Sequence, residues 1–113
     1  IGAGGGESRI CQEKTAVYAL GVVKNKPLLC LSLLININPL CDCAGQTAKK
    51  LIDDLGILIS QDPVAIDQAS LDWANQVAGK DLFAEVHGID YTPILKMGEE
   101  IGLGRRDYEI KKV

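Results

Sequence analysis

Two cysteines one residue apart, Cys41 and Cys43, are the residues of this sequence best suited to carry out chemistry. In an extended chain residues i and i+2 point to the same side, so both sulfurs can face a single soft metal ion. Zinc and iron–sulfur centres normally take four ligands, so Cys11, Cys30, His87 or a carboxylate would have to complete such a site. None of these residues lies at the distance from the pair, along the sequence, that a known metal-binding motif has. The pair therefore predicts half of a metal site.

The same pair admits two other interpretations. The thiols could close a small strained ring, and a strained disulfide is labile and redox-active. They could also be small apolar residues packed at the end of a strand, because cysteine is among the most buried residue types. A lone Cys-x-Cys is a weaker signal than paired Cys-x-x-Cys motifs. The polar Asp42 between the thiols favours a function over simple packing.

Apolar runs flank the pair, over residues 28–37 before it and 55–60 after it. The first run carries apolar side chains on both faces, which is typical of a central strand covered on two sides. We therefore predict an α/β fold with a small, mostly parallel sheet and helices on both faces. Ligands of such sheets gather at the carboxyl ends of the strands, and the thiol pair follows the first strand.

Caps and periodicity predict the other elements. Helices are expected over about 8–24 with Ser8 as N-cap, 62–77, 80–86 and 92–101, and an edge strand over 106–113. His87-Gly88 should end the third of these helices, and Gly102 with Leu103 behind it matches a C-terminal cap of the fourth. Asp62 followed by Pro63 is a strong helix start, because the carboxylate can cap the helix and the proline ring supplies the helical φ. We also consider Asp62 and Asp67 as groups just behind the metal ligands. Capping is the alternative role of Asp62, and Asp67 could simply be a solvated carboxylate.

Length and composition limit the class of protein. The chain has 113 residues, 47% of them hydrophobic, which is enough for one domain with a sizeable core. Residues 1–7 are predicted to be a glycine-rich linker or tail, and 8–113 a single α/β domain. Four cysteines are few for a disulfide scaffold, so we expect a reducing, cytoplasmic setting. A net charge of -3 without a basic stripe argues against nucleic acid, and no apolar run is long enough for a membrane helix.

Likeness to a known family rests on three stretches: Cys41-Asp42-Cys43, residues 54–70 and residues 100–104. They resemble the uncharacterised iron–sulfur-centre proteins known as domain of unknown function 362, and the likeness runs from about residue 12 to the C-terminus. The resemblance implies the C-terminal part of a longer protein, whose upstream part carries paired histidines and a ferredoxin-like segment with two four-cysteine motifs. Asp53 and Ala44-Gly45 depart from the family pattern, which commonly has a proline and an aromatic residue there.

Together these observations predict a metal- or iron–sulfur-associated redox protein with Cys41 and Cys43 as thiolate ligands. The cofactor would be an iron–sulfur cluster or another soft metal in the full-length protein, and whether this fragment alone binds one stays open. The alternative is a non-catalytic structural α/β module that docks against a ferredoxin-like or other partner domain. The partner is in either case the remainder of a longer chain or a partner subunit. Neither nucleic acid nor a membrane is expected, and no reaction is assigned.

Overall fold

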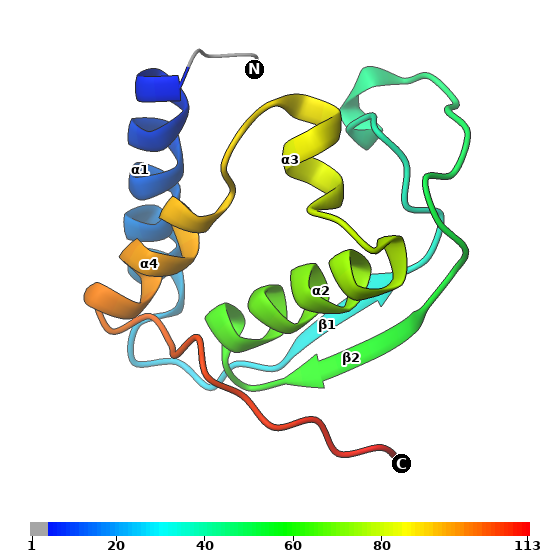
Figure 1. The fold of residues 1–113 in the computed structure, drawn as a ribbon. Helices are drawn as coiled ribbons and strands as arrows, with labels where there is room; N and C mark the ends of the chain where they lie inside the picture. Colours follow the sequence, from blue (N-terminus) through cyan, green and yellow to red (C-terminus); the bar gives the residue numbers. More distant parts are fainter. Residues whose placement is uncertain (1–4) are drawn as a thin grey trace.

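The computed structural model describes residues 5–113, apart from the side chains of residues 5, 6 and 42. Four helices and a two-stranded sheet make up this part of the chain (Figure 1). The elements in chain order are α1 (Gly5–Val23), β1 (Cys30–Leu34), the 3₁₀ turn η1 (Asp42–Ala44), β2 (Gly56–Ser60), α2 (Pro63–Ala78), α3 (Leu82–His87) and α4 (Thr92–Glu100). None of these helices has the length and apolar character needed to cross a membrane.

The two strands run antiparallel, with Leu31 opposite Ile59 and Leu33 opposite Ile57. The prediction of a mostly parallel sheet is therefore wrong. Two consecutive parallel strands need a crossover that returns the chain to the end of the sheet at which the first strand began, usually through a helix. Here an irregular loop, residues 35–55, reverses the chain instead.

Hydrogen bonds at the base of this loop explain the reversal. The backbone N–H of Leu55 donates to the carbonyl of Leu34 at 2.8 Å, and the N–H of Leu51 donates to the carbonyl of Ile37 at 2.7 Å. The loop therefore leaves β1 and enters β2 at neighbouring points, and we name residues 35–55 the cysteine loop.

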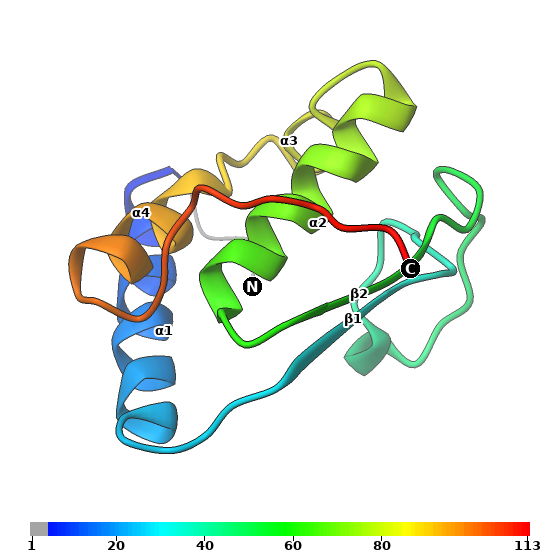
Figure 2. The ribbon, with the colours of Figure 1, turned by 90° about the horizontal axis from the view of Figure 1, so that it is seen from below.

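Among the described residues, a helix covers only one face of the sheet, which also corrects the prediction of helices on both faces. Helix α2 packs on that face (Figure 2), where the Ser32 and Ser70 hydroxyls lie 2.9 Å apart. Four large apolar side chains on the opposite face are more than half exposed: Leu31 (57%), Leu33 (56%), Ile57 (59%) and Ile59 (65%). We call these four residues the open sheet face.

Helix α2 begins as predicted. One oxygen of Asp62 accepts hydrogen bonds from the backbone N–H groups of Val64 and Ala65, each at 2.9 Å, so Asp62 is the N-cap. At the other end Gly79 adopts the left-handed conformation, with φ of 70°, that a helix C-terminus favours. The core contains residues from α2 and from its neighbours: Ala16, Leu34, Val64, Ile66, Ala69, Ala74, Leu82 and Leu95.

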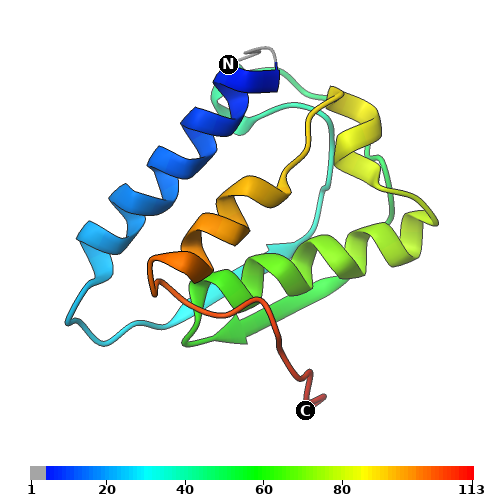
Figure 3. The ribbon, with the colours of Figure 1, turned by 60° about the vertical axis from the view of Figure 1, so that its left-hand side comes forward.

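Helix α1 lies along α4 rather than on the sheet (Figure 3). It begins at Gly5, and Ser8 is buried within it, so the predicted cap at Ser8 is wrong. The Gln12 amide fixes this arrangement, because it donates to the carbonyl of Asp90 at 2.8 Å and accepts from the N–H of Ile94 at 3.4 Å. The first helix is thereby held to the C-terminal part of the chain.

The end of α4 agrees with the sequence pattern, but the segment beyond it does not. Gly102 has φ of 78°, and the N–H of Leu103 donates to the carbonyl of Gly98 at 2.8 Å, as the predicted cap requires. The edge strand expected over 106–113 is absent from the described chain. The tail crosses α2 instead, where the Tyr108 hydroxyl donates to Asp72 at 2.7 Å. Side-chain bonding to a helix thus replaces pairing at the sheet edge.

Candidate functional site

The cysteine loop positions the two thiols through short local turns. The Asn38 side chain accepts the N–H of Leu40 at 2.9 Å, which turns the chain just before the first thiol. The N–H of Ala44 then donates to the carbonyl of Cys41 at 2.9 Å and closes the 3₁₀ turn that contains Cys43. Both cysteines therefore sit on one tight turn rather than on an extended strand.

The two sulfur atoms face each other at the protein surface. The Cys43 thiol donates to the Cys41 sulfur at 2.8 Å, which is longer than the ~2.05 Å of a disulfide bond. Both residues are exposed. Packing as buried apolar residues therefore does not describe this pair, whereas joint contact with one ion or oxidation to a disulfide would need little movement of the sulfurs.

The close contact changes the acidity of the pair. The hydrogen bond to Cys41, followed by the charge that Cys41 acquires when it ionises, raises the pKa of the Cys43 thiol. Loss of a proton from one sulfur therefore makes loss from the other harder. A metal ion that bound both sulfurs would displace their protons, because thiolates and not thiols are the metal ligands.

Two surface hollows border Cys41. One, of about 440 Å³, is also lined by Phe83, His87 and Tyr91, and the other, of about 400 Å³, lies among polar residues of the cysteine loop. His87 ends α3 beside Gly88, as the sequence predicts. His87 is one of the residues that the sequence offers to complete a metal site, and it lies at the same hollow as Cys41. No spacing rule predicts this position, because the two residues are far apart in the chain.

The other predicted site residues are spread over the fold. Asp62 caps α2 beyond the end of β2 that points away from the cysteine loop, and the structure does not bring it to the thiols. Asp67 lines a third hollow, which shares Phe83 and Tyr91 with the hollow at Cys41. Of the remaining cysteines, Cys11 lies on α1 and Cys30 begins β1, where burial raises the pKa of its thiol.

Within the described side chains no three His, Cys, Asp or Glu residues are grouped closely enough to hold one metal ion. The thiol pair is a set of two soft ligands, which fits a thiophilic metal such as zinc, Cu(I) or the iron of a cluster. Two ligands are fewer than a tetrahedral centre takes. The pair fits part of such a site, and further ligands have to come from outside the described side chains.

Fold and site together define a small domain of mixed helices and strands, with an exposed thiol pair on a loop between antiparallel strands. A family model described as Domain of unknown function (DUF362) matches residues 4–72, more than half of the chain. The chain therefore belongs to the DUF362 family, as the resemblance indicates. The matched segment contains Cys41 and Cys43 and most of α2. Neither the curated proteins nor the solved structures compared with the chain include a match.

Proposed function

We propose that this chain carries part of a soft-metal redox site in which Cys41 and Cys43 are thiolate ligands. The observation that supports the proposal is the exposed pair of sulfurs 2.8 Å apart on one 3₁₀ turn. Soft thiolates favour zinc, Cu(I) and iron–sulfur clusters over hard oxygen-binding ions. An iron–sulfur cluster, when bound, would supply one-electron transfer.

The missing ligands would come from the remainder of a longer chain or from a partner subunit, for example a ferredoxin-like one. His87 is a further candidate on this chain, because it lines the same hollow as Cys41. A reducing, cytoplasmic compartment suits the proposal, since exposed thiols would otherwise be oxidised. The role of this chain is then to present two neighbouring sulfurs whose protons the metal displaces.

Metal titration tests the proposal on the chain as it stands. Protein purified without oxygen is titrated with Cd²⁺, a soft ion whose thiolate complexes absorb in the ultraviolet, and metal content is measured after desalting. We expect binding in the wild type and its loss in the double variant Cys41→Ser, Cys43→Ser. The matched control is Cys11→Ser, which removes an exposed thiol on α1 and should leave binding unchanged. Stoichiometric metal in the double variant would contradict the proposal.

A second candidate function is supported by the open sheet face. Exposed apolar patches of this kind mark interaction surfaces in many proteins. In this reading the domain is a non-catalytic module that docks against a ferredoxin-like or other partner domain, and its thiols remain reduced and inert. The titration separates the two candidates. A chain that takes up no soft metal, and whose pair can be alkylated without effect on folding, would favour the structural module.

A further inference from the structure

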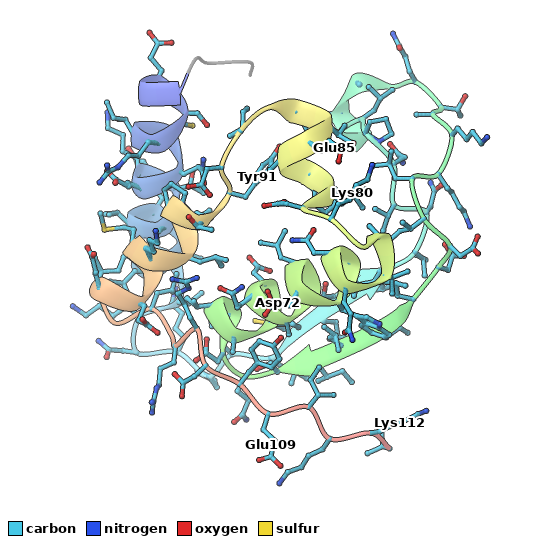
Figure 4. All side chains as sticks on the ribbon, viewed as in Figure 1. Asp72, Lys80, Glu85, Tyr91, Glu109 and Lys112 are labelled. Carbon is cyan, nitrogen blue, oxygen red and sulfur yellow. The ribbon has the colours of Figure 1, made fainter. Side chains whose placement is uncertain are left out.

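A hollow of about 320 Å³ lies between β1, α2, α3 and α4, on the side of α2 away from the tail. Its walls are mostly apolar and include Leu34, Leu71, Phe83, Tyr91 and Ile94. Tyr91 comes from the segment between α3 and α4 and lies close to α3 (Figure 4). Its ring meets that of Phe83 edge to face, with centroids 6.1 Å apart and planes at 74°. The two rings therefore hold each other in place.

One carboxylate, Asp67, stands among these apolar groups. The surrounding atoms desolvate Asp67 in part, which raises the pKa of its carboxyl group, but the residue as a whole is exposed to solvent. In the part of the chain that the structure describes, no hydrogen bond or ion pair involves its side chain. The neighbouring Ser70 hydroxyl is already bonded to the Ile66 carbonyl at 2.7 Å and to Ser32. The carboxylate is therefore open to a charged partner from solution.

We propose that this hollow binds a small organic cation, an ammonium group attached to an apolar body. Asp67 supplies the opposite charge, and Leu34, Leu71 and Ile94 receive the body. Phe83 and Tyr91 add aromatic surface, which attracts cations through the ring quadrupole. Mostly apolar walls with one well-placed polar group are the usual composition of a small-molecule site. Charge complementarity selects the class of ligand, because an anion would be repelled by Asp67 and a neutral molecule would gain no attraction from its charge.

The site adjoins the thiol pair without depending on it. Phe83 and Tyr91 also line the hollow that contains Cys41 and His87, so a bound cation would lie next to the cysteine loop. Ligand recognition by Asp67 needs no metal. Loss of metal binding in the cysteine variants and loss of cation binding in an Asp67 variant are therefore separate results.

Nuclear magnetic resonance titration of the whole chain tests the proposal with three probes of similar size: benzylammonium, benzyl alcohol and benzoate. We expect benzylammonium to shift the backbone signals of Ser70, Leu71 and Ile94. The neutral and anionic probes should bind at least about tenfold more weakly, which is the order expected from one charged hydrogen bond. Equal binding of all three probes, or binding of none, would overturn the proposal.

Two variants locate the charge that is recognised. Asp67→Asn keeps the shape of the side chain and should reduce benzylammonium affinity about tenfold to the level of benzyl alcohol. Asp53→Asn removes an exposed carboxylate of the cysteine loop and should leave the affinity unchanged. Unchanged affinity in Asp67→Asn would overturn the proposal. If that variant does not fold, the comparison of the three probes on the wild type still decides.

Discussion

Asp62 and Arg105 are joined across 43 positions of the chain, because the backbone N–H of Arg105 donates to one oxygen of the Asp62 carboxylate at 2.8 Å. The other oxygen of the same carboxylate caps α2. A single side chain therefore starts the central helix and fastens the tail across it. The sequence indicates the first role through the following Pro63, but contains no local signal for the second.

Asp62→Ala should lower the free energy of unfolding by about 2 kcal/mol, about half from the lost cap and half from the lost bond to the tail. Urea unfolding measures the loss. Asp81→Ala is the matched control, because Asp81 caps the short helix α3 through one longer bond of 3.3 Å. We expect less than about 1 kcal/mol for this control. Equal losses in the two variants would show that the bond to Arg105 contributes nothing.

Gly104 lies against the same carboxylate, so a side chain there should be costly. An added Cβ would contact an Asp62 oxygen and lie 2.7 Å from its Cγ. Gly104→Ala should therefore destabilise the fold by about 1–3 kcal/mol. Gly21→Ala offers the opposite case, because no other group lies within 4 Å of a Cβ at that exposed position of α1. That change should stabilise the helix by about 0.5–1 kcal/mol. Thermal unfolding checks both predictions, because the midpoint temperature should fall in Gly104→Ala and rise in Gly21→Ala.

The Tyr108 hydroxyl should lose its proton at a higher pH than an ordinary tyrosine does. Burial, and then the hydrogen bond to Asp72 and its negative charge, raise the pKa of Tyr108 to about 12, above the ~10 of an unfolded chain. The folded state then holds this proton more tightly than the unfolded state. The resulting stabilisation is complete below about pH 10 and is lost as pH rises through about 12. The difference in tyrosinate absorbance between the wild type and Tyr108→Phe isolates this group.

Asp72→Asn is the partner variant for that titration. Removal of the carboxylate charge should lower the pKa of Tyr108, because burial is then the main remaining cause of the shift. An unchanged titration curve in Asp72→Asn would mean that the contact across α2 does not persist in solution.

The thiol pair should show coupled reactivity. Because Cys41 raises the pKa of Cys43, Cys41→Ser should lower that pKa and make Cys43 react faster with iodoacetamide at a fixed pH near 8. Mass spectrometry of quenched samples reports the rate at each residue. Cys11→Ser removes a thiol elsewhere and should not alter the rate at Cys43. A slower reaction of Cys43 in Cys41→Ser would contradict the effect of Cys41 on the pKa of Cys43.

The elements that could be predicted from the sequence are those with chemical signals at their own ends. Asp62-Pro63 predicts the start of α2, and the bond from Leu103 to Gly98 confirms the cap expected after α4. The direction of β2 could not be read in this way. Apolar content indicates a strand, but it contains no information on which way the neighbouring strand runs. The hydrogen bonds at the base of the cysteine loop decide that, and they join backbone groups that any sequence provides.

The course of the tail and the surroundings of the thiol pair could not be predicted, for a related reason. Alternation at Tyr108 and Ile110 predicts a strand, yet the hydroxyl of Tyr108 finds Asp72 on α2, a partner distant in sequence. The thiol pair could be recognised as a candidate site because its two residues are adjacent. Its neighbour Tyr91 could not, and His87 was one of several candidates that the sequence could not rank, since only the packing of the fold brings both to the hollow at Cys41.

The closure of the cysteine loop has a consequence for how this protein can change. Its two ends are joined by backbone hydrogen bonds at Leu34–Leu55 and Ile37–Leu51. These bonds use no side chain, so they hold the two ends together whatever the sequence between them. Doubling the length of a flexible loop costs only about 0.6 kcal/mol. We therefore expect the strand register to be retained when peptides with other ligand sets replace the thiol-bearing segment between residues 38 and 50.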